Sequence, residues 1–134
     1  MRSRRTIRPG RALIASILSL VILMLALPGA TMAAQEKERE RSCSARSDWY
    51  LYVGREDGRR LEVEFEVDSE RQGQAWRVML KNDGQVFFRG TRTTNARGEF
   101  EVKRFTGDGQ GSDRIVARAK NLSTGEVCRG VIRL

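Results

Sequence analysis

Leu61-Glu-Val-Glu-Phe-Glu-Val67 is the stretch that decides the fold of this chain. Its four apolar residues alternate strictly with three glutamates. Successive side chains of a β-strand point to opposite faces of a sheet, so this period of two predicts a strand with one buried and one solvent-facing side. We expect Glu62, Glu64 and Glu66 to lie on the solvent-facing side, paired across strands with arginine or lysine.

The same alternation recurs on both sides of this stretch, always interrupted by short segments rich in glycine, asparagine and aspartate. Within the strand predicted over 85–94 we expect Val86 and Phe88 to face the core. Seven short strands separated by turn signals are typical of an antiparallel β-sandwich, with a barrel as the alternative. The sequence therefore predicts one all-β domain over 48–134, with strands near 49–53, 61–67, 75–81, 85–94, 99–103, 114–120 and 127–134.

Residues 1–34 have the three parts of a signal peptide. Five arginines and no acidic residue precede the uncharged apolar run from Ala12 to Leu27, and small residues follow up to Ala34. We expect a signal helix that is removed after Ala33 or Ala34, which makes the domain secreted, periplasmic or exposed on the cell envelope. The alternative is an uncleaved anchor: the apolar run is short for a membrane span, which needs about 20 residues, and the domain would still face outward.

Residues 35–47 are polar and charged and lack apolar periodicity, which predicts a flexible tether. The two cysteines of the chain, Cys43 and Cys128, both lie in the exported part. An even number of cysteines in an oxidising compartment favours a disulfide. We therefore predict a Cys43–Cys128 bond, which would fix the end of the tether to the last strand.

The basic character of the whole chain comes largely from its first 34 residues. The chain has 25 basic and 17 acidic residues, a formal net charge of +8. Five of the basic residues and none of the acidic ones precede residue 35, so the remaining domain has a formal charge of +3. Because both signs are interspersed along it, we expect an ordinary mixed surface and no nucleic-acid partner.

The residue types present exclude several kinds of catalytic site. The chain has no histidine, which rules out a Ser-His-Asp triad and an imidazole zinc site. Paired carboxylates remain as the basis of a hydrolase, but glutamates on an open strand face lack the cleft that such chemistry needs. The sequence predicts a protein that is not an enzyme and needs no cofactor or metal.

Tyr50 and Tyr52 share one side of the first predicted strand, opposite Trp49, Leu51 and Val53. Two exposed tyrosines can stack on a sugar or contact a protein, which makes them a candidate partner surface. The sequence favours the alternative interpretation, in which they form structural cross-strand pairs.

Three further stretches carry a resemblance to a known class of protein. Gly98-Glu-Phe-Glu-Val102, Asp113-Arg-Ile-Val-Ala-Arg-Ala119 and Thr124-Gly-Glu-Val-Cys-Arg-Gly130 resemble immunoglobulin-like modules of small secreted proteins from high-GC bacteria. The resemblance covers Trp76 to Gly130 and implies an immunoglobulin-like sandwich, without functional residues to carry over.

These observations predict an exported, non-enzymatic β-sandwich that binds an envelope protein or a glycan. A structural or accessory secreted module without a ligand of its own is the alternative, and a carboxylate-based hydrolase is the least favoured. A membrane contact is expected only if the signal segment stays uncleaved. The sequence does not determine the oligomeric state.

Overall fold

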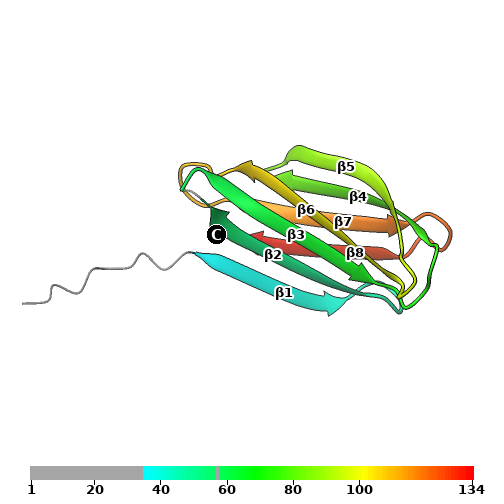
Figure 1. Ribbon diagram of the computed structural model, residues 1–134. Coiled ribbons are helices and arrows are strands. Elements are labelled where there is room, and N and C mark those ends of the chain that lie inside the picture. The colour runs from blue at the N-terminus through cyan, green and yellow to red at the C-terminus, as the bar shows by residue number, and fades with distance from the viewer. Residues whose placement is uncertain (1–34, 57) are drawn as a thin grey trace, which may run out of the picture. The chain divides into compact units, whose positions relative to one another are not determined.

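The computed structural model describes residues 35–56 and 58–134, which form two packed antiparallel sheets (Figure 1). The predicted signal segment and its cleavage site lie outside the described residues. No helix that could span a membrane occurs in the ranges described. The predicted all-β sandwich is thus confirmed for this part of the chain.

Sheet A consists of β1 (Glu36–Ser42), β2 (Asp48–Glu56), β3 (Arg60–Asp68) and β6 (Glu99–Gly107), in the spatial order β1-β2-β3-β6. Every neighbouring pair in it is antiparallel. In this sheet the three consecutive strands β1, β2 and β3 lie side by side, and β6 joins them from a later part of the sequence.

Sheet B consists of β4 (Ala75–Asn82), β5 (Gln85–Thr93), β7 (Arg114–Asn121) and β8 (Val127–Arg133), in the order β5-β4-β7-β8. It is made of two hairpins, because β4 pairs with β5 and β7 pairs with β8. The hairpins join through the antiparallel pair of β4 and β7.

The core lies between the two sheets and follows the alternation of the sequence. Leu61, Val63, Phe65 and Val67 are all 0% exposed, as their spacing predicts. Trp76 packs against Phe100 with ring centroids 6.1 Å apart, which joins the sheets through an aromatic pair. Other fully or nearly fully buried side chains are Leu51, Val53, Val78, Leu80, Val102, Ile115, Ala117, Ala119, Cys128 and Ile132.

The prediction of seven strands is wrong, because the described residues form eight. The additional strand, β1, lies within 35–47, where the sequence predicted a flexible tether. All seven residues of β1 are exposed, so no apolar alternation marks it. Pairing with β2 and the nearby Cys43 hold it in the sheet.

The prediction that Val86 faces the core is also wrong: Val86 is 43% exposed, and Phe88 is only partly buried. A bulge explains the error. Leu80 lies opposite Phe88, whereas Lys81 lies opposite Val86, so Phe87 is an extra residue in β5. One inserted residue reverses the side to which the preceding side chains point, which turns Val86 outward.

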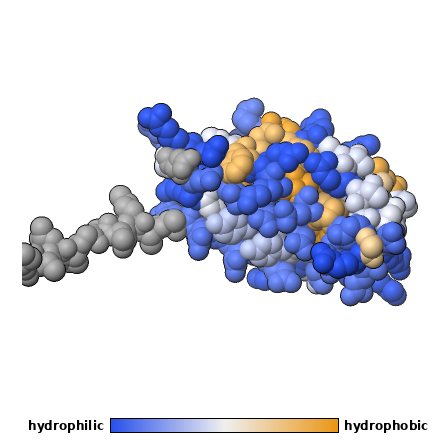
Figure 2. Space-filling view, viewed as in Figure 1, coloured by the Kyte–Doolittle hydropathy of each residue, from blue (hydrophilic) through white to orange (hydrophobic). Residues whose placement is uncertain are grey.

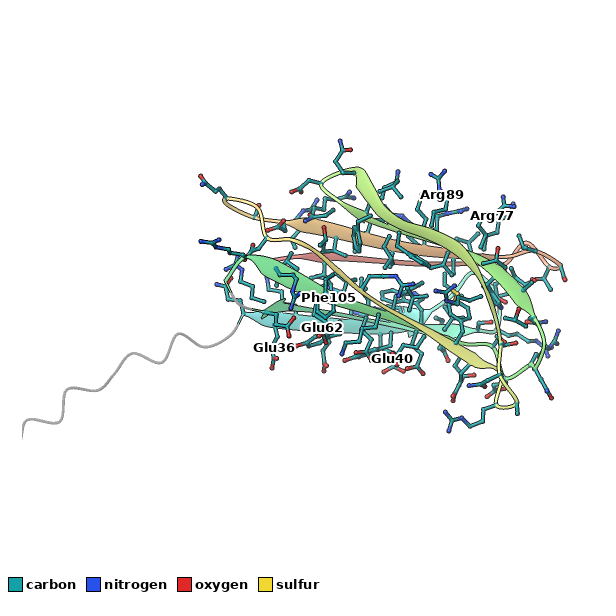
Figure 3. All side chains as sticks on the ribbon, turned by 45° about the horizontal axis from the view of Figure 1, so that its top comes forward. Glu36, Glu40, Glu62, Arg77, Arg89 and Phe105 are labelled. Carbon is teal, nitrogen blue, oxygen red and sulfur yellow. A yellow bond between two sulfur atoms is a disulfide. The ribbon has the colours of Figure 1, made fainter. Side chains whose placement is uncertain are left out.

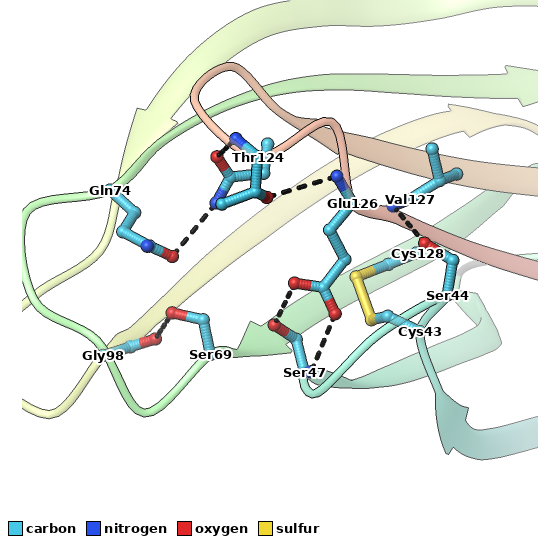
Figure 4. Close-up of a disulfide and its surroundings, with 11 residues drawn as sticks. Cys43, Ser44, Ser47, Ser69, Gln74, Gly98, Thr124, Glu126, Val127 and Cys128 are labelled. Carbon is cyan, nitrogen blue, oxygen red and sulfur yellow. Dashed lines mark hydrogen bonds between the residues drawn. A yellow bond between two sulfur atoms is a disulfide. The ribbon is translucent and has the colours of Figure 1, made fainter.

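The predicted disulfide between Cys43 and Cys128 is confirmed, with the two Cα atoms 4.3 Å apart (Figure 4). It joins the residue after β1 to β8 and therefore connects the edges of the two sheets. Ser44 adds a hydrogen bond beside it, because its Oγ accepts from the backbone N–H of Val127 at 2.8 Å. A buried disulfide fits an oxidising, extracytoplasmic location.

Candidate functional site

The outer face of sheet A is strongly acidic. Its side chains alternate with the buried ones, so the residues that project outward follow from the strand registers. Two cations, Arg60 and Lys103, stand among them. We call this surface the acidic face, and its carboxylates are Glu36, Glu38, Glu40, Asp48, Glu56, Glu62, Glu64, Glu66, Asp68, Glu99 and Glu101.

The outer face of sheet B has the opposite charge. The positions that project outward from its four strands, all of them described, include eight cations and no carboxylate. None of these eight side chains forms an ion pair within the part of the chain that the structure describes. We call this surface the basic face, and its cations are Arg77, Lys81, Arg89, Arg114, Arg118, Lys120, Arg129 and Arg133.

The two charged faces lie on opposite sides of the sandwich. In Figure 3, Glu36, Glu40 and Glu62 project on one side, and Arg77 and Arg89 project on the other. Figure 2 shows mostly hydrophilic or neutral atoms over β1, β2 and β3, with hydrophobic atoms gathered toward β5 and β6. The expectation of a mixed surface is therefore wrong, because charges that are interspersed along the sequence separate in space.

Like charges lie directly opposite one another within each face. On the basic face Arg118 is the register partner of Arg129, and Arg114 is that of Arg133. Such pairs are destabilising, because the side chains of directly opposite residues are close together. The separation of charge therefore does not help the isolated domain to fold.

The acidic face also contains an opposed pair of like charges, Glu66 and Glu101. This pair contradicts part of the prediction that the glutamates of β3 meet cations across strands. Glu62 and Glu64 do meet a lysine across strands, since Lys103 Nζ lies 2.7 Å from Glu62 and 3.9 Å from Glu64. Glu66 instead lies opposite Glu101. Its predicted pairing with a cation is wrong, because β6 places a second glutamate at that position of the register.

Crowding of the carboxylates changes their ionisation. Burial, together with the charges of Glu99 and Glu101, raises the pKa of Glu66 above its ordinary value. Burial and the neighbouring Glu101 likewise raise the pKa of Glu64, and the nearby Lys103 opposes that rise. Both groups are thus harder to ionise than an isolated glutamate, because burial and the neighbouring negative charges oppose the charged form.

Tyr50 and Tyr52 lie on the acidic face, half-buried, and on the same side of β2 as predicted. The Tyr50 hydroxyl donates to Glu38 Oε2 at 2.8 Å, and the Tyr52 hydroxyl donates to Glu36 Oε2 at 3.2 Å. Burial and the bond to Glu38 raise the pKa of Tyr50 to about 12. These bonds tie β1 to β2, and the two rings form the aromatic part of the acidic face together with Phe105, which projects from β6 and is 44% exposed.

A polar cleft lies at one end of the sandwich, beside the disulfide (Figure 4). It has a volume of about 380 Å³, and Arg46, Arg71 and Gln74 are among its lining residues. Glu126 spans part of it, since its carboxylate accepts from the backbone N–H of Ser47 at 2.8 Å and from the Ser47 hydroxyl at 2.9 Å. These bonds fix the loop after β1 to the turn before β8.

The sequence contains a signal for these faces that hydropathy alone does not reveal. Glu36-Lys-Glu-Arg-Glu-Arg41 alternates in charge with a period of two. In β1 this alternation puts Glu36, Glu38 and Glu40 on the acidic face and turns Lys37, Arg39 and Arg41 to the other side. Alternation of charge sign, taken together with hydropathy, therefore indicates both the strand and its orientation.

The fold and its surface define a class of protein: a small, disulfide-linked antiparallel β-sandwich whose two outer faces have opposite charge. Comparison with family models, with curated proteins and with solved structures found no match for this chain. We therefore take the candidate functional site from the structure itself: it consists of the acidic face and the basic face. Across the described residues, no cluster of three or more cysteine, aspartate or glutamate side chains could hold a metal ion.

Proposed function

We propose that this chain is an exported, non-enzymatic interaction module that binds an anionic partner of the cell envelope through its basic face. The observation that carries the proposal is the set of eight arginines and lysines projecting from sheet B without a carboxylate among them. Six of the eight are arginines, whose planar guanidinium binds carboxylate, sulfate and phosphate groups through two hydrogen bonds.

The electrostatic repulsion among these cations supports the binding of an anion to the basic face. A cation that has no internal partner and faces other cations gains when an anion approaches, because the repulsion within the face is relieved. Apolar side chains, Met79, Val116 and Val131, lie between the cations and are only partly exposed or buried. They give the face a less polar centre, as in protein interfaces.

Export and the immunoglobulin-like class belong to the same proposal. Export is supported by the signal-like residues 1–34 and by the disulfide. The order of sheet B, two hairpins joined through their first strands, resembles the part of the larger sheet of variable immunoglobulin domains in which the C–C′ and F–G hairpins meet through strands C and F. Sheet A, with three consecutive strands side by side, has no such counterpart.

A binding experiment with matched variants tests the proposal. The probe is immobilised heparin, an anionic glycan, and the readout is the NaCl concentration that elutes the exported chain, purified without the signal-like residues 1–34. Reversal of the opposed pair, Arg118→Glu with Arg129→Glu, is expected to lower that concentration at least twofold, because it places two negative charges within the basic face.

The control changes the net charge equally at positions outside both faces. Arg46→Glu with Arg59→Glu alters two exposed arginines in loops at the ends of the sandwich. If the two double variants elute alike, the net charge of the chain governs binding and the basic face is not a site. Failure of the unchanged protein to bind heparin at low salt would also contradict the proposal.

A further inference from the structure

We propose that the acidic face of one copy of this chain docks on the basic face of a second copy, so that copies stack face to back. The inference rests on the proposed function, because it identifies the anionic partner of the basic face as another copy of the same chain. It assigns a role to both charged surfaces through a single contact.

The charges of the two faces are nearly balanced. Eleven carboxylates and two cations leave the acidic face with a formal charge of −9, and the basic face carries +8. An anionic glycan or lipid surface would neutralise sheet B and leave the acidic face unneutralised. In a row of copies, the neighbours on its two sides neutralise both faces of each inner copy, which is why the observations favour a second copy over a different partner.

The two faces also match in size. Each is a four-stranded sheet with strands of seven to nine residues. Such a sheet is roughly 19 Å wide and 26 Å long. Contact between two of them would bury about 1,000 Å² in total, the lower limit for a specific interface and typical of a weak, reversible one.

Side chains on the inner strands of the two faces are suited to each other. Tyr50 and Tyr52 lie on β2, an inner strand of the acidic face, beside β3. Arg118 lies on β7, an inner strand of the basic face, with Arg129 opposite it on the edge strand β8. An arginine placed over a tyrosine ring gains a cation–π contact, so this pairing would add to the attraction between carboxylates and guanidinium groups.

The contact is heterologous, because the two surfaces that meet are different. A heterologous contact leaves one free acidic face and one free basic face at the ends of every assembly. It therefore produces rows of copies whose length rises with concentration. Since opposite charges drive it, the rows should dissolve when salt screens the faces.

Sedimentation velocity of the exported chain, purified without the signal-like residues 1–34, tests this inference. At an ionic strength of about 0.01 M the screening length is about 30 Å, and at 1 M it is about 3 Å. We expect species larger than a monomer that grow with concentration at the low ionic strength, and a monomer alone at the high one. A monomer at every concentration in low salt would overturn the inference.

Two charge-reversed variants give the decisive experiment. Glu66→Lys with Glu101→Lys changes the acidic face alone, and Arg118→Glu with Arg129→Glu changes the basic face alone. Each replaces one opposed like-charge pair by another of the opposite sign. The repulsion within that pair is therefore retained, and the pair does not destabilise the fold more than before. Each variant by itself is expected to be a monomer in low salt.

Mixing the two variants should restore one contact. The first retains an intact basic face and the second an intact acidic face, so an equimolar mixture should form assemblies larger than the monomer that either variant gives alone. If single variants still assemble, or the mixture stays monomeric while the unchanged protein assembles, face-to-back stacking is wrong. The Arg46→Glu with Arg59→Glu control is expected to assemble like the unchanged protein.

The outcomes separate this inference from the proposed function. A chain that binds heparin through its basic face but remains a monomer in low salt contradicts stacking and leaves the proposed function intact. A monomer that binds anionic phosphatidylglycerol vesicles, with loss of binding in the Arg118→Glu with Arg129→Glu variant, identifies a lipid surface as the partner in place of a second copy. A chain that neither binds heparin nor assembles contradicts both proposals.

Discussion

At the scale of single residues, Tyr50 and Tyr52 show how a side chain can be structural and available to a partner at once. Their hydroxyls hold β1 through Glu38 and Glu36, while their rings stay half-exposed. Gly54, two residues after Tyr52, allows this arrangement: a Cβ atom at that position would overlap the Tyr52 ring. The position of the Tyr52 ring on the acidic face thus depends on a missing side chain on the same strand.

The ionisation of Tyr50 provides a prediction at this scale. Its pKa is raised from 10.0 to about 12 in the folded protein. The folded protein therefore holds this proton more tightly than the unfolded chain does. The contribution of the neutral Tyr50 hydroxyl to the free energy of unfolding is fully present below pH 10, where the unfolded chain also keeps the proton, and is lost as the pH rises toward 12. We expect the urea midpoint of unfolding to fall over that window, and to fall less in Tyr50→Phe.

The phenolate absorbance checks the assignment directly. In the folded protein the phenolate of Tyr50 should form near pH 12, and Tyr52, the other tyrosine of the chain, should also ionise above the ordinary value, because burial and Glu36 raise its pKa. Tyr52→Phe therefore leaves the ionisation of Tyr50 alone, and Tyr50→Phe leaves that of Tyr52 alone. A titration near the ordinary value of a tyrosine in Tyr52→Phe would contradict the assignment to Tyr50.

At the scale of elements, β1 is a strand that the rest of the fold holds in place. It contributes no buried side chain, and isolated strands of charged residues have little tendency to form. Its hydrogen bonds to β2, the two tyrosine bonds and the disulfide that follows it are what order it. Because β1 carries three of the carboxylates of the acidic face, the disulfide also supports that face.

Removal of the disulfide is the corresponding prediction. Cys43→Ala with Cys128→Ala opens a loop with a sequence separation of 85 residues. In the chain-entropy model its closure stabilises the fold by about 4–5 kcal/mol, so we expect a large fall in the free energy of unfolding. Hydrogen exchange should show the amides of β1 losing protection before those of β3.

The double alanine variant avoids a free thiol, so reshuffling of disulfides does not confuse the measurement. If the amides of β1 keep the protection of β3 in this variant, pairing with β2 is enough to order the strand. The proposed dependence of the acidic face on the disulfide would then be wrong.

At the scale of the whole molecule, the dominant feature is the separation of charge between two faces. Opposed like-charge pairs occur on both of them, among them Arg118 with Arg129 and Glu66 with Glu101. Each such pair is unfavourable by a few tenths of a kcal/mol or more. The isolated domain is therefore less stable than its well-packed core alone would make it.

Salt should accordingly stabilise the fold while it weakens binding. Raising NaCl from about 0.01 M to about 1 M is expected to increase the free energy of unfolding by roughly 1–2 kcal/mol, because it screens several exposed like-charge pairs. The measurement is urea unfolding at a protein concentration low enough to keep the chain monomeric. A domain with mixed surface charge would show the opposite sign or no change, and that result would contradict the argument.

Much of the fold follows from the sequence by itself, because strand alternation is local. Leu61 to Val67, the core positions of β2, β4 and β7, and the Cys43–Cys128 bond could all be predicted from residue types and spacing. Each of these depends on residues one or two positions apart, or on the chemistry of a pair of cysteines. The side of β2 on which Tyr50 and Tyr52 lie follows in the same way.

The tertiary structure alone decided which strands became neighbours. That choice placed the acidic sides of β1, β2, β3 and β6 in one sheet and the basic sides of β4, β5, β7 and β8 in the other. It also added β1 and reversed Val86 through the bulge at Phe87. Pairing between distant segments fixes these features. The period of two within a strand therefore predicts the orientation of its side chains but not which other strands lie beside them.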